Sequence, residues 1–86
     1  MSDFVHAAVR GYLADLGGPE DQLLSEIRAR SKADGVPAIS PDTGRLLHVL
    51  AMSVGPGRIL EIGTGYGCSG IHLARALAPG GMLFTI

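Results

Sequence analysis

Hydrophobic residues near the start of the chain recur at intervals of three and four positions, which places them on one face of an α-helix. This face consists of Phe4, Val5, Ala8, Val9, Tyr12, Leu13 and Leu16. Ser2 is a suitable N-cap for the helix, and the pair Gly17-Gly18 would end it. We therefore expect a first amphipathic helix whose hydrophobic face needs a partner to cover it.

A second helix is expected directly after the glycine pair. Its signals are a proline in the first turn, acidic residues near the positive end of the helix dipole and basic residues near the negative end. These residues are Pro19, Glu20, Asp21, Arg28, Arg30 and Lys32. The hydrophobic stripe of this helix is thin, with Leu23, Leu24 and Ile27 alone. Residues 1–35 are therefore interpreted as an N-terminal helical segment.

The next segment begins with an extended connector. Pro37 and Pro41 disfavour helical geometry in the residues before them, so residues 35–39 are predicted to be extended. Ser40, as a cap, then predicts a third helix that runs to about Val54, where a Gly-Pro-Gly sequence stops it. Hydrophobic residues lie on most sides of this helix, which is typical of a helix packed between other elements.

The last third of the chain alternates strand, helix and strand. The hydrophobic run from Arg58 to Ile62 is too short for a helix and predicts a buried strand of a parallel sheet. A helical pattern follows from Ser69 to Ala78, and residues 82–86 predict a second strand. Two strands joined by a helix in this way form a βαβ unit with parallel strands.

Composition excludes several classes of protein. The 86 residues are 47% hydrophobic and 17% charged, which is typical of a folded chain rather than a disordered one. A net charge of -1 without a cluster of Lys and Arg argues against nucleic acid as a partner. The longest uncharged hydrophobic stretch, residues 46–54, is too short to cross a membrane. A single cysteine, Cys68, and the lack of a secretory signal at the N-terminus indicate a cytoplasmic location.

The glycine-rich loop between the predicted strand and its helix carries the strongest functional signal. Gly63, Gly65 and Gly67 alternate with other residues, so the backbone can take positive φ and approach a ligand closely. The helix that follows offers unpaired N–H groups. We expect a site for a polar, nucleoside-like molecule at the carboxyl end of the strand. The alternative is a tight turn that needs glycine for its shape alone.

The residues around this loop favour some ligands over others. No lysine follows the last glycine, so nucleoside triphosphates are disfavoured. A G-x-G-x-x-G fingerprint occurs at Gly65, Gly67 and Gly70, which leaves an NAD(P)- or flavin-dependent oxidoreductase as an alternative. However, Glu61 places an anion near the strand tip, where a pyrophosphate would be repelled. A carboxylate there suits a ligand with a cationic group and hydroxyl or ammonium donors.

Other residues of the loop and its helix suggest weaker alternatives. Cys68 near a helix N-terminus is a candidate reactive thiol, although a small packed side chain is the simpler interpretation. Ser69 and His72 are three positions apart, but no carboxylate follows to orient the histidine for nucleophilic hydrolysis. Tyr66 is a candidate ligand contact or a residue packed over its own helix.

Three segments together resemble a known family. The pattern Glu-x-Gly-x-Gly-x-Gly after a hydrophobic strand resembles the first motif of class I methyltransferases. Residues 36–47, 59–69 and 80–86 are similar to the opening of the catechol/caffeoyl-CoA type of bacterial O-methyltransferase. The resemblance implies an α/β fold made of N-terminal helices and the first βαβ unit of a Rossmann-like doubly wound parallel sheet. Residues 36–86 would begin the cofactor-binding domain.

The family also implies a cofactor, an acceptor and site residues. The cofactor would be S-adenosylmethionine, whose methyl group passes to a hydroxyl of a small catechol-like or phenolic acceptor held near a divalent, Mg-like cation. The cofactor-binding positions of the family fall on Ile39, Glu61, Gly63, Thr64 and Ser69. Catalytic residues, metal ligands and the ribose-binding acid of the family belong to segments after the one present here. Cys68 departs from the tyrosine that the family often has.

Further expectations concern the oligomeric state, the folding of the chain and the residue that follows it. The N-terminal helices are expected to form a homodimer, as comparable helices do in the family, and a non-catalytic dimerisation module is the second alternative function. Two parallel strands expose both edges of the sheet, so the 86-residue chain alone is expected to be inactive and poorly folded. If the reading frame continues after Ile86, Glu or Asp is expected next.

Overall fold

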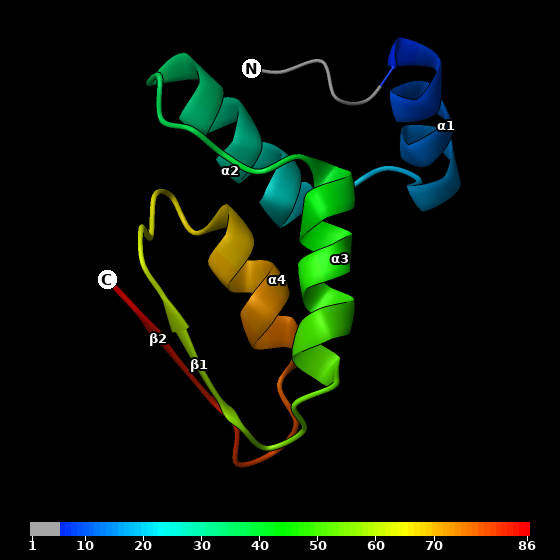
Figure 1. Cartoon of the computed structure of the whole chain (residues 1–86). Coiled ribbons are helices and arrows are strands. Elements are labelled where there is room, and N and C mark those ends of the chain that lie inside the picture. Colours follow the sequence, from blue (N-terminus) through cyan, green and yellow to red (C-terminus); the bar gives the residue numbers. More distant parts are fainter. Residues whose placement is uncertain (1–5) are drawn as a thin grey trace.

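The computed structural model describes residues 6–86, which form helices and strands in the predicted order (Figure 1). The elements are α1 (Ala7–Gly17), α2 (Gln22–Ala33), α3 (Pro41–Met52), β1 (Arg58–Glu61), α4 (Cys68–Ala76) and β2 (Met82–Thr85). The predicted α/β class is confirmed. None of the helices over residues 6–86 combines the length and hydrophobicity that a transmembrane segment requires.

Polar side chains cap the N-termini of α1 and α3. In α1, Nδ1 of His6 accepts a hydrogen bond from the backbone N–H of Ala8 at 3.1 Å. The predicted cap, Ser2, lies outside the described residues, as do the first two hydrophobic positions of the predicted helix face. The start of α3 is confirmed, with Ser40 as its cap and a proline in its first turn.

α2 starts later than the sequence predicts. Oδ1 of Asp21 accepts a hydrogen bond from the backbone N–H of Leu24 at 3.0 Å, so Asp21 is the cap and the helix begins at Gln22. Pro19 and Glu20 therefore lie before the helix, and the prediction that Pro19 lies in its first turn was wrong. The carboxylate satisfies an otherwise unpaired N–H of the first turn, which fixes the start of the helix.

The two strands form a parallel pair that confirms the βαβ unit. Arg58 of β1 lies beside Met82 of β2, and Glu61 lies beside Thr85. Backbone pairing continues past these bounds, because the N–H of Gly63 donates to the carbonyl oxygen of Ile86 at 2.6 Å. The glycine loop thus begins at the carboxyl ends of both strands.

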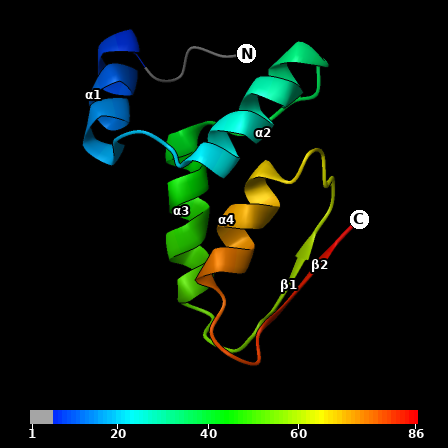
Figure 2. The same ribbon diagram turned by 180° about the vertical axis from the view of Figure 1, so that it is seen from behind.

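The helices lie on one side of the sheet, as the two opposite views show (Figures 1 and 2). α4 packs against α3 and β2 and also contacts α2, whereas α1 contacts α3. The buried hydrophobic residues of this arrangement are Leu24, Ala51, Cys68 and Leu73. The core therefore lies where α4 meets α2 and α3, directly behind the glycine loop.

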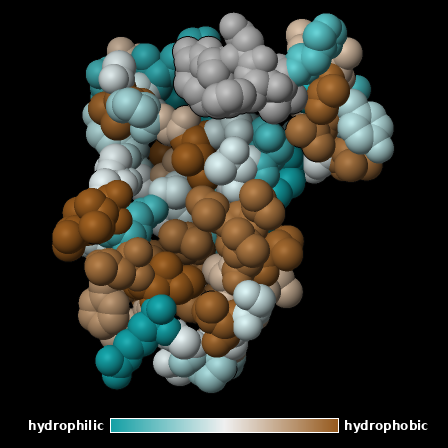
Figure 3. Space-filling view, viewed as in Figure 1, coloured by the Kyte–Doolittle hydropathy of each residue, from teal (hydrophilic) through white to brown (hydrophobic). Residues whose placement is uncertain are grey.

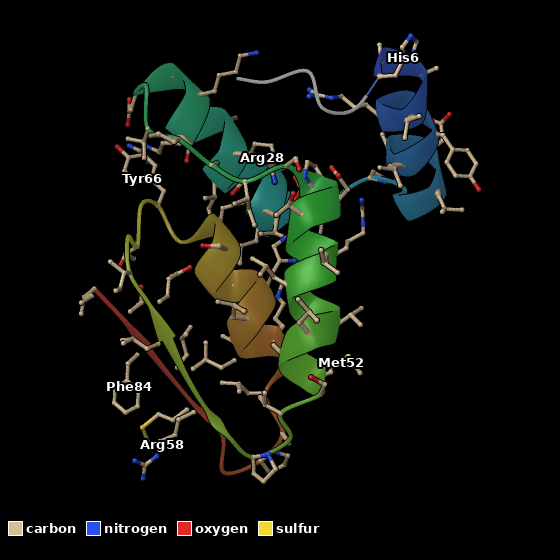
Figure 4. All side chains as sticks on the ribbon, in the orientation of Figure 1. His6, Arg28, Met52, Arg58, Tyr66 and Phe84 are labelled. Carbon is tan, nitrogen blue, oxygen red and sulfur yellow. The ribbon has the colours of Figure 1, made fainter. Side chains whose placement is uncertain are left out.

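Much of the hydrophobic surface outside this core is exposed. Leu46, Val49 and Leu50 of α3 are each more than half exposed, and Figure 3 shows hydrophobic surface where α3 lies. Leu60 of β1 is 64% exposed, and Phe84 of β2 points away from the helices (Figure 4). The predictions of a sandwiched third helix and a fully buried strand were therefore wrong for this chain. The helices cover only one face of the sheet, where α4 contacts β2. α3 is covered only where α1 and α4 contact it.

Candidate functional site

A pocket of about 250 Å³ opens between the connector that precedes α3 and the glycine loop that follows β1. Its walls are formed by Pro37, Ala38, Ile39, Gly63, Thr64, Gly65, Cys68 and Ser69. Four of the five residues that the sequence analysis singles out line this pocket, namely Ile39, Gly63, Thr64 and Ser69. The tertiary structure thus brings the connector, which is distant in sequence, to the glycine loop.

Three glycines of the loop have backbone conformations that other residues rarely adopt. The φ angles of Gly63, Gly65 and Gly67 are 95°, 54° and 93°. Gly67 is also the N-cap residue of α4, and no side chain there caps the N–H groups of the first helical turn. A Cβ at Gly63 would meet no atom within 4 Å, which leaves the backbone open on that side. The loop can therefore present bare backbone to a ligand.

Glu61 is held by a network of hydroxyl groups beside the pocket. Its carboxylate accepts hydrogen bonds from the hydroxyl of Ser69 and from Oγ1 of Thr85, the latter at 2.8 Å. Oγ1 of Thr64 lies 2.7 Å from Oγ1 of Thr85 and extends the network to the loop. Glu61 is half-buried and does not itself line the pocket. The donors that its position requires are thus two side-chain hydroxyls, and its network reaches the pocket through Thr64 and Ser69.

Cys68 lines the pocket, but its thiol is poorly suited to reaction. The side chain is buried, and this burial raises the pKa of the thiol, while the guanidinium of Arg28 opposes the rise. A higher pKa lowers the fraction of reactive thiolate at neutral pH. The interpretation of Cys68 as a small, packed side chain fits this environment.

Ser69 and His72 do not form a hydrolytic pair. The Ser69 hydroxyl donates to Glu61, whereas Nε2 of the buried His72 lies 3.8 Å from a carboxylate oxygen of Glu20. Desolvation lowers the pKa of His72, and the Glu20 carboxylate opposes this effect. The histidine therefore belongs to the helix interface behind the pocket.

Tyr66 points away from the pocket, although it belongs to the same loop. Its hydroxyl donates to Oδ2 of Asp34, the residue after α2, at 2.6 Å. This bond to a carboxylate raises the pKa of the tyrosine. Tyr66 lines a separate surface hollow with Ile27, Arg30 and Asp34. Neither of the two predicted roles, contact with a ligand in the main pocket or packing over α4, describes this position.

Arg28 reaches the pocket from behind and was missed as a site residue. Its guanidinium donates to the carbonyl oxygen of Ile39 and lies 3.4 Å from Sγ of Cys68. The sequence analysis assigned Arg28 to the helix dipole alone. Its partner Glu20 precedes the helix and is eight positions away, so no helical spacing links the two residues.

The described residues offer no metal site. Over residues 6–86, no group of three or more His, Cys, Asp or Glu side chains is arranged to hold a metal ion. The three histidines lie in different elements, at the cap of α1, in α3 and in α4. The pocket itself offers backbone and hydroxyl groups to a ligand, with the carboxylate of Glu61 beside it.

Known proteins similar to this chain were found by sequence and by structure. No family model matches the chain. A catechol O-methyltransferase from Niastella koreensis is 39% identical over 88 residues, a region that takes in 100% of this chain and 40% of the relative. This chain thus spans about 40% of the length of that relative.

Solved structures of O-methyltransferases are also similar to this chain. The O-methyltransferase from Bacillus cereus, in complex with S-adenosylhomocysteine, is 40% identical with a TM-score of 0.75. The O-methyltransferase TomG from Streptomyces achromogenes, which is involved in tomaymycin synthesis and was solved with S-adenosylmethionine, is 43% identical with the same TM-score of 0.75. Each comparison covers 91% of this chain and 36% of the other chain.

Proposed function

We propose that this chain is the N-terminal part of a class I O-methyltransferase and that its protein transfers a methyl group from S-adenosylmethionine to a small hydroxyl acceptor. The acceptor would be catechol-like or phenolic. Residues 1–35 would form the N-terminal helical segment, and residues 36–86 the start of the Rossmann-like cofactor-binding domain. A cytoplasmic location accords with the single, free cysteine.

The observation that carries this proposal is the pocket between the connector and the glycine loop. It is lined by Ile39, Gly63, Thr64 and Ser69, and the carboxylate of Glu61 is joined to it through hydroxyl groups. A ligand with an ammonium group and a ribose diol has the donors that carboxylate and hydroxyl oxygens accept. The residues present therefore fit the methionine side of S-adenosylmethionine.

Each residue would have a distinct part in holding the cofactor. The bare backbone at Gly63 allows close approach, and the half-buried Ile39 offers a hydrophobic wall. The hydroxyls of Thr64 and Ser69 would orient polar groups of the ligand, with Glu61 supplying negative charge for its cationic end. When bound, the cofactor supplies an electrophilic methyl group on a sulfonium. The chain's own residues would hold it in place for transfer, which is catalysis by positioning.

Residues 6–86 contain no group of three or more His, Cys, Asp or Glu side chains that could hold the divalent cation of the family. A cation that lowers the pKa of the acceptor hydroxyl would have to be held by other residues of the protein.

The oxidoreductase alternative gains no support from the comparisons, which yielded O-methyltransferases. Gly70, the third glycine of its fingerprint, is buried in α4, where an added Cβ would lie 3.3 Å from a carboxylate oxygen of Glu61. The close approach of helix and strand at this point accounts for the glycine. The dimerisation module gains no support as a separate function either.

A homodimer through the N-terminal helices remains part of the proposal. α1 contains no buried residue, and Tyr12 and Leu16 are 64% and 70% exposed. Hydrophobic side chains this exposed are typical of a surface that a partner covers. Sedimentation of the full-length protein should give a dimer, and Leu16→Glu should shift it to the monomer. A monomeric wild-type protein would contradict this part of the proposal.

The proposed function is tested by cofactor binding to the full-length protein. We expect tritiated S-adenosylmethionine to be retained and to be displaced by S-adenosylhomocysteine, whereas NAD should not compete. Retention of NAD without retention of S-adenosylmethionine would overturn the proposal in favour of the oxidoreductase.

A further inference from the structure

Arg28 of α2 contacts both walls of the candidate cofactor pocket. Nη1 donates to the carbonyl oxygen of Ile39 in the connector, and Nη2 lies 3.4 Å from Sγ of Cys68 at the start of α4. Ile39 and Cys68 both line the pocket. Figure 4 shows Arg28 where α2 passes beneath the connector, close to the start of α3. A single guanidinium thus links Ile39 and Cys68, which are 29 positions apart in the sequence (39 to 68) but line the same pocket.

Glu20 fixes the orientation of this guanidinium. Nε of Arg28 donates to one carboxylate oxygen of Glu20 at 2.7 Å, and Nη2 donates to the other at 2.9 Å. This two-point contact holds the planar guanidinium in one direction, so that Nη1 is aimed at Ile39. The Glu20 side chain is only 9% exposed, which shields the pair from solvent. The Arg28 hydrogen bond lowers the pKa of Glu20, so the carboxylate stays ionised at neutral pH.

We infer that Arg28, oriented by Glu20, is a positioning residue that sets the separation of the connector and the first turn of α4 around the methyl donor. This inference rests on the proposed function, because it concerns the affinity of the same pocket. Arg28 would not touch the cofactor. It would act through the backbone of Ile39 and the side chain of Cys68.

The other links between α2 and the pocket region cannot replace this one. The bond from Tyr66 to Asp34 holds the loop at a residue that does not line the pocket. The backbone bond from Val36 to the carbonyl oxygen of Ser31, at 2.8 Å, fixes the connector before its pocket-lining part. A lysine at position 28 could not contact Glu20, Ile39 and Cys68 together, because an ammonium lacks the planar fork of a guanidinium.

The test compares Arg28→Lys and Arg28→Gln with a matched control in the full-length protein. The control is Arg75→Gln, because Arg75 forms a similar ion pair, with Asp21 at 2.6 Å, but is exposed and does not line the pocket. The dissociation constant of S-adenosylmethionine is measured by calorimetry well below the unfolding temperature of each variant. R28Q loses the charge-assisted hydrogen bonds of the guanidinium, so it should bind S-adenosylmethionine about tenfold or more weakly than the wild type. R28K should be weakened less, and R75Q should bind like the wild type.

A second readout separates positioning from simple stability. Bound S-adenosylmethionine should slow hydrogen exchange of the glycine loop, residues 63–67, measured by mass spectrometry of the peptide that contains it. At the ligand concentration that protects the wild type, the protection should be smaller in R28K while its circular dichroism stays native. If R28Q does not fold, R28K and Glu20→Gln decide the matter, because each retains part of the contact set.

Two results would overturn the inference, and they are distinguishable. If the wild type binds S-adenosylmethionine and both R28K and E20Q bind it equally well, Arg28 does not position the pocket while the proposed function stands. If the wild type does not bind S-adenosylmethionine, the proposed function fails and this inference fails with it.

Discussion

Gly44 of α3 lies directly against the imidazole ring of His72 of α4. A Cβ at Gly44 would be 2.4 Å from Nε2 of His72, far closer than two side chains can approach. Both residues are buried where the two helices meet. The absence of a side chain at Gly44 therefore allows α3 and α4 to pack closely behind the candidate pocket.

Gly44→Ala should destabilise the protein by about 1–3 kcal/mol, because the added methyl overpacks this contact. The free energy of unfolding is measured by urea denaturation of the full-length protein. In a His72→Ala background the same methyl finds space, so its cost should fall towards zero. An equal cost in both backgrounds would show that the ring of His72 is not what Gly44 accommodates.

His72 should also make stability depend on pH. Burial lowers its pKa in the folded protein, so between its folded pKa and its usual value of about 6.5 the unfolded state binds a proton that the folded state does not. The neutral, buried His72 therefore contributes fully to the free energy of unfolding above about pH 6.5. This contribution is lost as the pH falls from 6.5 towards the pKa of His72 in the folded protein.

Denaturation at a series of pH values from about 7.5 to 5.5 tests this dependence above the range in which carboxylates titrate. The free energy of unfolding of the wild type should decline over this interval. His72→Gln, which lacks the titrating group, should decline less steeply. Parallel curves for the two proteins would show that His72 is not the source of the pH dependence.

Gly63 is expected to be intolerant of a side chain because of its backbone alone. Its φ is 95°, and a Cβ there would meet no atom within 4 Å, so Gly63→Ala introduces strain without a clash. The expected cost is about 1–2 kcal/mol, the penalty for a left-handed conformation in a residue with a Cβ.

Gly11 provides the matched control for this substitution. It lies within α1, has no positive φ and is equally open. Gly11→Ala should stabilise the protein by about 0.5–1 kcal/mol, since alanine has the higher helix propensity. Chemical denaturation of both variants should give changes of opposite sign, and a neutral Gly63→Ala would contradict the strain at the loop.

Glu61→Gln should weaken the binding of S-adenosylmethionine by about tenfold or more, because it removes the negative charge and retains only one acceptor oxygen. Glu26→Gln is the control, since Glu26 is exposed on α2 and bonded to Gln22 away from the pocket. Isothermal titration calorimetry with the full-length proteins measures both affinities. Equal binding by the two variants would mean that Glu61 serves the hydroxyl network alone.

The local sequence predicted most of the elements correctly because their signals act over a few residues. The Ser40 cap with its following proline, the glycines that flank β1 and the short hydrophobic runs each determine a boundary through neighbouring atoms. The start of α2 was misplaced because two local signals competed. The carboxylate of Asp21 reached the N–H of Leu24, and Pro19 was left outside the helix.

The site was predicted only in part, and for a physical reason. The alternating glycines after a strand marked the loop, and the resemblance to a known family named Ile39, Gly63, Thr64 and Ser69, which line the pocket. Arg28 had no such signal. Its role depends on contacts with Glu20, Ile39 and Cys68 that form only when α2 packs beside α4.

The sequence by itself determined the order of helices and strands, the glycine loop with its positive φ angles and the carboxylate at the strand end, since backbone sterics and short-range hydrogen bonds specify these features. Only the tertiary structure decided that Glu61 is held by Ser69 and Thr85, that Tyr66 turns to α2, and which hydrophobic faces stay exposed. These outcomes depend on which segments meet in space. The hydrophobic effect is non-directional and does not specify which surfaces pack together, and the hydrogen-bond partners of a side chain are set only once the helices have packed.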